Sequence, residues 1–137
     1  MANEDAVWAE TTDGGLLKQL FGYYPTLHDA RMLSIEIDRA EDSIHMVVDY
    51  NDMVGDDDEQ DLSARIRIEW HGITSFELPL GDIDLVSLDF DRQGNQIETS
   101  IETWPGVFGT VLSDTVEAIL VQIDPGEASD RSWIRYK

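Results

Sequence analysis

Residues 86–101 read VSLDFDRQGNQIETSI, and this stretch does most to decide the fold. Apolar and polar residues alternate over 86–90, and a matching alternation runs over 97–101. A period of two is typical of a strand with one buried face. The intervening Arg-Gln-Gly-Asn at 92–95 contains the residue types that tight turns favour. The stretch therefore predicts an antiparallel β-hairpin.

The same period of two recurs before this hairpin. It covers 33–37 and 44–50, which a short turn joins, and it returns over 64–70. His71-Gly72 is predicted to be a turn, and a further strand is expected over 76–80. These segments predict several antiparallel strands, each with one apolar face.

Two segments nearer the C-terminus are harder to assign. Residues 107–112 are apolar without a clear period, while 115–123 fits a helix by spacing and a strand by its β-branched content. We expect a strand over 115–123, because its neighbours are strands, and a short final strand at 133–136. The sequence thus predicts a mainly β (α+β) protein, either an antiparallel β-sandwich or a strongly bent sheet. We expect residues 1–137 to form a single domain.

One short N-terminal helix is predicted before the first strand. Leu16, Leu17, Leu20 and Phe21 share one helical stripe, and Gly22 stands where a helix commonly stops. Residues 1–13 are expected to form a loosely ordered arm, from which Trp8 docks on the body of the protein.

The charge is strongly one-sided. Asp and Glu number 29 and Lys and Arg number 9, which gives a formal net charge of −20. Such a field repels nucleic acid and anionic membranes and attracts basic proteins, although it also serves solubility without any partner. We therefore expect binding neither to nucleic acid nor to membranes.

The chain contains no cysteine, which excludes disulfides and thiol catalysis. Its acidic start does not resemble a signal peptide, and no apolar run reaches the roughly 20 residues that a membrane span needs. We expect a cytoplasmic location.

The three histidines are the first candidates for catalysis. Only His28 has a carboxylate next to it, that of Asp29, and no Gly-x-Ser-x-Gly element is present to supply a nucleophile. His45 is predicted to point outward from a strand, and His71 to lie in a turn. The sequence therefore indicates that the protein is not an enzyme. A small enzyme centred on His28-Asp29 is the alternative.

The acidic segment 49–61 is the candidate for a cation site. Placing Gly55 at the sixth position of a calcium-binding loop puts Tyr50 first and Val54 fifth, where carboxylates are required. Because the pattern fails, we predict a solvated loop, with no metal and no cofactor. A ligand- or cation-binding module remains a second alternative.

Large aromatic residues are frequent in the predicted loops and at strand ends. They are Trp8, Tyr23, Tyr24, Trp70, Trp104, Trp133 and Tyr136. Tyr and Trp often anchor protein interfaces, and they also cap small β-cores with the ring buried and the polar atom wet. Both interpretations stay open.

Residues 20–38 resemble the opening of the immunity protein 50 family of bacterial polymorphic toxin systems. The resemblance rests on Phe21-Gly22, Pro25 and His28-Asp29-Ala30, which an alternating strand follows. The segment at 68–73, IEWHGI, is also similar to a mid-chain strand of that family. In such a protein Phe21, Gly22, Pro25, His28 and Asp29 would form a structural motif.

The resemblance implies a protein that binds and neutralises a cognate toxin, with a basic nuclease as the expected target. An acidic surface could then steer the protein onto a basic active site and occlude it. The predicted interface residues are Asp56, Asp57, Asp58, Glu59, Tyr23, Tyr24 and Trp104.

Overall fold

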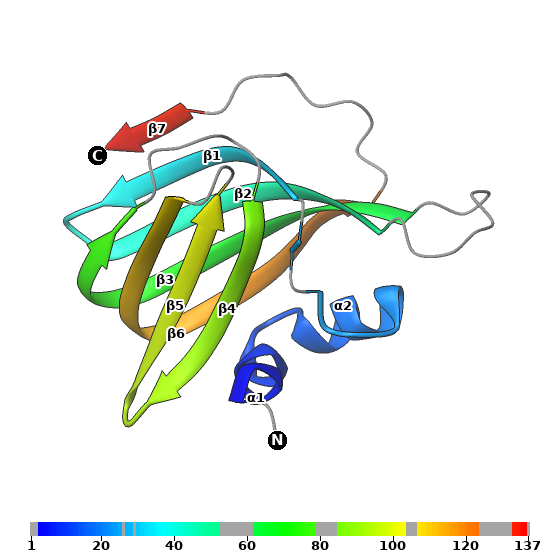
Figure 1. Cartoon of the computed structure of the whole chain (residues 1–137), viewed down its shortest axis with the longest axis horizontal. Coiled ribbons are helices and arrows are strands. Elements are labelled where there is room, and N and C mark those ends of the chain that lie inside the picture. Colours follow the sequence, from blue (N-terminus) through cyan, green and yellow to red (C-terminus); the bar gives the residue numbers. More distant parts are fainter. Residues whose placement is uncertain are drawn as a thin grey trace.

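The computed structural model describes residues 3–25, 27–28, 30–52, 62–78, 85–103, 107–123 and 133–136. Its elements are α1 (Asn3–Glu10), α2 (Gly14–Phe21), β1 (Arg31–Asp38), β2 (Ser43–Asp52), β3 (Leu62–Glu77), β4 (Leu85–Gln93), β5 (Gln96–Thr103), β6 (Val107–Ile123) and β7 (Trp133–Tyr136). These strands form one sheet in the order β4-β5-β6-β3-β2-β1-β7 (Figure 1). Neighbours among β1 to β6 are antiparallel, and β7 runs parallel to β1. The mainly β prediction is confirmed, whereas the described residues show a single sheet and not a sandwich.

The hairpin predicted from residues 86–101 is formed by β4 and β5. Arg92 pairs with Ile97, and Gln93 with Gln96, so the turn falls at residues 94–95. The alternation places Leu88, Phe90, Ile97, Thr99 and Ile101 on the buried face. Periodicity and turn chemistry together were therefore enough to define this pair of strands.

The turn predicted at His71-Gly72 is wrong, because β3 continues through both residues as far as Glu77. Gly72 adopts a φ of 69°, which glycine accepts without the steric cost that a Cβ would bring. The pairing of β3 with β6 also shifts register between Ile73 and Ser75. Glycine and the bulge thus bend the strand instead of ending it.

The strand predicted at 115–123 is confirmed, and it is continuous with 107–112 in the long strand β6. Residues 107–113 of β6 pair with β5, where Val111 lies opposite Thr99, and residues 110–123 pair with β3, where Val116 lies opposite Trp70. Residues 110–113 therefore have a strand neighbour on both sides. Strands β3 and β6 both curve along their length (Figure 1). The curvature brings the strands on either side of β6 around the same core.

Two helices precede the sheet, where one was predicted. Residues 3–10 form α1 and not a loosely ordered arm. The reason is tertiary packing: Val7 and Trp8 are buried, and the Trp8 ring meets that of Phe90 on β4 edge to face at 5.2 Å. The docking of Trp8 on the body is confirmed. Helix α2 ends as predicted at Gly22, whose φ of 87° lets its N–H bond to the carbonyl of Lys18 at 2.7 Å.

The link between the helices covers an edge of β6. Strand β5 pairs with β6 only up to Ser113, and no other strand of the described residues borders the later part of β6 on that side. Asp13 fills part of this edge: its N–H bonds to the Ala118 carbonyl at 2.8 Å, and its carboxylate accepts the Leu120 N–H at 2.8 Å. The link therefore satisfies backbone groups that an open edge would expose.

The core lies on one face of the sheet and beneath the helices. Its largest fully buried side chains include Trp8, Trp70, Ile68, Met46 and Leu17. The opposite face of β2 and β3 carries charged and imidazole side chains, which are described below. Among the described residues, no helix is both long enough and apolar enough to span a membrane.

Candidate functional site

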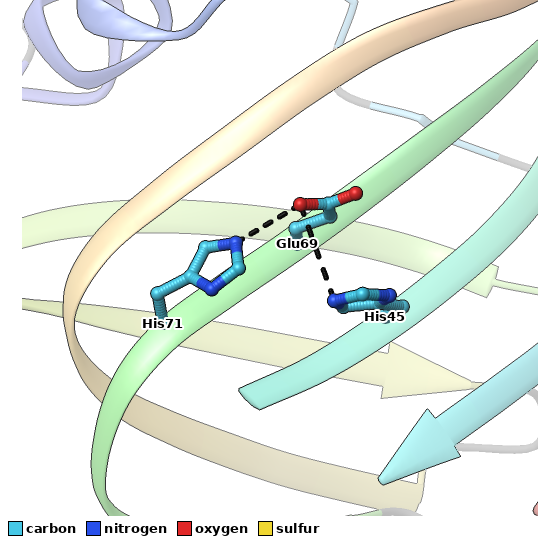
Figure 2. Close-up of side chains that lie close together, drawn as sticks. All are labelled: His45, Glu69 and His71. Atoms are coloured by element: carbon cyan, nitrogen blue, oxygen red, sulfur yellow. Dashed lines mark hydrogen bonds and ion pairs between the residues drawn. The ribbon is translucent and has the colours of Figure 1, made fainter. Parts of the chain in front are cut away.

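Three side chains capable of acid–base chemistry or metal binding meet on the outer face of β2 and β3 (Figure 2). Glu69 and His71 are two residues apart on β3, and a period of two places them on the same face. His45 on β2 is the direct cross-strand partner of Glu69. We call His45, Glu69 and His71 the imidazole–carboxylate cluster.

The two histidine rings converge on one carboxylate oxygen. Nε2 of His71 lies 2.9 Å from Oε1 of Glu69, and Nε2 of His45 lies 4.0 Å from the same oxygen. One potential ligand atom from each residue falls within 4.8 Å of the others. The Glu69 side chain is only 13% exposed, while those of His45 and His71 are 31% and 42% exposed. The carboxylate is therefore the most buried group of the cluster, and both imidazoles are partly exposed to solvent.

The second oxygen of Glu69 is held from another direction. Nε of Arg67 donates a hydrogen bond to Oε2 at 2.6 Å. Burial by itself would raise the pKa of the Glu69 carboxyl, but the hydrogen bond from His71 and the charges of His45 and Arg67 outweigh it. The pKa of Glu69 is consequently lowered, and the group is a fixed anion at neutral pH.

The cluster sits in a row of polar residues that crosses four strands. Glu36 on β1 is the register partner of His45, and Glu117 on β6 is the register partner of Glu69. Glu117 accepts hydrogen bonds from the backbone N–H and the hydroxyl of Thr12. The row therefore places acidic residues on both sides of the cluster, which favours a cation there.

The arrangement suits two kinds of chemistry. Two imidazoles and a carboxylate are a common ligand set for first-row divalent metals. A histidine can also act as a general base when a hydrogen-bonded carboxylate orients its imidazole, although such a base needs a nucleophile or substrate within reach. Neither of the two cavities described below is lined by a residue of the cluster.

The larger cavity, of about 430 Å³, lies between the β1–β2 hairpin and the last residues of β3. We call it the hairpin cavity, and its lining includes Ile37, Asp38, Arg39, Asp42, Ile44, Ile73 and Phe76. β2 pairs with β3 only up to His71, so residues 73–77 of β3 have no partner from β2. A smaller cavity of about 230 Å³ includes Glu10, Arg92 and Asp114 in its lining.

Most of the interface residues predicted from the sequence fall outside the described residues. These are Asp56, Asp57, Asp58, Glu59 and Trp104. Tyr23 and Tyr24 are described and are half-buried. The Tyr23 hydroxyl bonds to that of Tyr50 at 2.9 Å, and the Tyr24 ring stacks on Trp8. For both tyrosines, contact with the body accounts for much of the ring surface.

The predicted structural motif is only partly described. Phe21 and Pro25 are buried, and Gly22 caps α2. His28 is exposed and lines neither described cavity, and Asp29 lies outside the described residues. The sequence left open whether each large aromatic residue anchors an interface or belongs to the core. Trp8 and Trp70 are fully buried and belong to the core.

The imidazole–carboxylate cluster was not found from the sequence. The spacing of Glu69 and His71 was the available signal, since two residues two apart on a strand share a face. That signal was lost because His71 was placed in a turn. The position of His45 opposite Glu69 depends on the register of β2 with β3, and no local sequence pattern predicts that register.

No family model matches the chain, and no curated protein matches its sequence. Among solved structures, an uncharacterized protein from Neisseria gonorrhoeae is similar, with a TM-score of 0.46 and 10% sequence identity. The likeness covers 66% of this chain and 90% of that chain. Similarity at this level carries no argument about function. The resemblance to the immunity protein 50 family therefore stays a prediction.

Proposed function

We propose that this protein binds a basic protein partner and blocks its activity, as an immunity protein does for its cognate toxin. The net charge of −20 is the observation on which the proposal rests. Several of the few basic side chains are already engaged: Arg65 with Asp49, Arg67 with Glu69, and Arg92 with Glu10. Each pair cancels one positive and one negative charge, and the net charge of −20 already counts every basic residue. The acidic side chains in excess give the protein a long-range attraction for a basic surface.

The hairpin cavity is the best candidate among the described residues for the contact itself. Its walls include apolar side chains, of which Phe76 is 39% exposed, and the two carboxylates of Asp38 and Asp42 outnumber the guanidinium of Arg39. A lysine or arginine side chain suits such a site, because its apolar stem can lie on the walls while its charge meets a carboxylate. The predicted interface at Asp56–Glu59 and Trp104 is a further part of this proposal.

Catalysis is less well supported than binding. An enzyme centred on His28 needs a pocket over that residue, and His28 lines neither of the described cavities. The imidazole–carboxylate cluster lies on the face of a sheet. Neither described cavity includes a residue of the cluster, so neither would enclose a substrate bound there. Function has to be argued from a complete site, and a charged contact surface needs fewer components than a catalytic one.

The test is co-expression of this protein with each toxin domain that a neighbouring gene encodes. Co-expression is expected to rescue growth, and the two purified proteins are expected to form a complex. The association rate should fall about 10-fold or more as salt rises from low to near-physiological concentration, because screening weakens the steering. Cell death despite abundant soluble protein would contradict the proposal.

A matched pair of variants locates the contact. Asp42 and Asp89 are both exposed, but only Asp42 lines the hairpin cavity. Asp42→Asn and Asp89→Asn change the net charge equally, and asparagine tolerates the φ of 49° at position 42. We expect Asp42→Asn to weaken the complex about 10-fold and Asp89→Asn less than about 2-fold. Equal effects would mean that the partner docks elsewhere.

A further inference from the structure

The imidazole–carboxylate cluster gathers three ligand groups within reach of one ion. Two of them come from one strand and the third from its neighbour, so the pleat and the register of the sheet fix their relative positions. We propose that His45, Glu69 and His71 bind a first-row divalent metal ion, with Zn²⁺ as the expected occupant.

The distances require only small side-chain movements. Ligand atoms at about 2.0–2.1 Å from a tetrahedral Zn²⁺ are separated from one another by about 3.3 Å. The His71–Glu69 distance of 2.9 Å would have to widen slightly, and the His45–Glu69 distance of 4.0 Å would have to shorten. Both changes are within the reach of small rotations of the imidazoles, which leave the sheet backbone in place. The two rings already meet edge to face, with centroids 5.8 Å apart.

Glu69 is held in the orientation that a ligand needs. Arg67 bonds to Oε2, which leaves Oε1 facing the two imidazoles (Figure 2). A carboxylate fixed through its second oxygen is a common outer-shell arrangement at metal sites. The positive charge of Arg67 opposes a cation at this distance, whereas Glu36 and Glu117 on the neighbouring strands favour one.

The donor types define the class of metal. Imidazole suits Zn²⁺, Co²⁺, Ni²⁺ and Cu²⁺, whereas Ca²⁺ and Mg²⁺ require mainly oxygen ligands. Three protein ligands leave a fourth position for water or for a group from another molecule. The histidine side chains are 31% and 42% exposed, so that position would face solvent. The inference is independent of the proposed toxin binding, and either can fail without the other.

The experiment is a calorimetric titration of the full-length protein, without a histidine tag, with Zn²⁺. A protein with a net charge of −20 has weak carboxylate sites for divalent cations, and millimolar Mg²⁺ in the buffer occupies them. We expect one site with a dissociation constant in the micromolar range or tighter. At a 100-fold excess of Zn²⁺ over that constant, the melting temperature should rise by about 5–10 °C. Co²⁺ should give a visible absorption band typical of four-coordinate nitrogen and oxygen ligation.

The third histidine provides a matched control. His28 is exposed and is not part of the cluster, so His28→Ala should bind Zn²⁺ as the wild type does. His45→Ala and His71→Ala should each weaken binding at least about 100-fold, and Glu69→Gln about 10- to 100-fold. Circular dichroism and metal-free melting curves will show whether each variant folds, with His45→Asn and His71→Asn as substitutes for any that does not.

Two outcomes would overturn the assignment. One is the absence of a stoichiometric Zn²⁺ site in the wild type when Mg²⁺ is present. The other is Zn²⁺ binding that survives both His45→Ala and His71→Ala in folded protein, because the ion would then be held by other groups.

Discussion

The indole N–H of Trp70 on β3 donates a hydrogen bond of 2.8 Å to the hydroxyl of Thr99 on β5. Both residues are fully buried, and β6 lies between their strands in the sheet. The contact is therefore made across the inside of the bend and not between neighbouring strands. It gives the core a polar link beside residues 110–113 of β6, which pair with β5 on one side and with β3 on the other.

We expect Thr99→Val to destabilise the protein by about 1–3 kcal/mol. The substitution keeps the volume of the side chain but leaves the Trp70 N–H buried without an acceptor. Urea unfolding of the variant and the wild type measures the change. In a Trp70→Phe background the same substitution should be nearly neutral, because no donor is left unsatisfied. An equal cost in both backgrounds would show that the hydrogen bond contributes nothing.

Gly72 is expected to resist substitution more strongly than other glycines with positive φ. An added Cβ would lie 2.8 Å from Cβ and Cγ of Asp114, and the φ of 69° already disfavours an L side chain. Gly94 has a similar φ of 66° but nothing within 4 Å of an added Cβ, so it isolates the backbone effect. We expect Gly94→Ala to cost about 1 kcal/mol and Gly72→Ala about 2–4 kcal/mol in unfolding free energy. Equal costs would mean that the Asp114 side chain moves aside freely.

The strands were predictable from the sequence because a strand with one buried face alternates apolar and polar residues. The hairpin at 86–101 carried both the period and the turn residues, and both were found. Helix α1 was missed because Val7 and Trp8 are its main apolar anchors, and so short a helix depends on packing rather than on propensity. Gly72 was read as a turn residue, although in β3 it bends a strand that continues.

The candidate site was less predictable than the fold. His28 is a candidate from the sequence because a carboxylate follows it, but neighbours in sequence need not share a face. His45 and Glu69 are 24 positions apart and meet only because β2 and β3 pair in one register. Non-local pairing of this kind is settled by the packing of the whole sheet and not by any local motif.

Arg65 and Asp49 form a second cross-strand pair on the outer face of β2 and β3, and we expect it to stabilise the sheet. Nε and one terminal nitrogen of Arg65 bond to the two oxygens of Asp49 at 2.8 and 3.1 Å. The hydrogen bond to Asp49 raises the pKa of the guanidinium, against the opposing effect of burial. A double-mutant cycle with Arg65→Ala and Asp49→Ala should give a coupling of about 1 kcal/mol.

The paired hydrogen bonds account for this coupling, so a lysine should not restore it. Arg65→Lys keeps the charge but cannot form the fork, and we expect it to retain less than about half of the coupling. Full retention in Arg65→Lys would show that charge alone is sufficient. The same cycle at high salt distinguishes the two contributions, since screening weakens charge attraction more than it weakens a hydrogen bond.

Asp13 is expected to protect the covered edge of β6. Asp13 accepts the Leu120 N–H through its side chain and donates its own N–H to the Ala118 carbonyl. Asp13→Ala removes the first bond and keeps the second, so we expect a cost of about 1–2 kcal/mol in unfolding free energy. Amide exchange at Leu120 should accelerate about 10-fold, whereas Asp13→Asn, which retains an acceptor oxygen, should change it less. If exchange at Leu120 were the same in all three proteins, the helix link would not protect the edge, and the tendency of β6 to pair with a second chain would have to be controlled in another way.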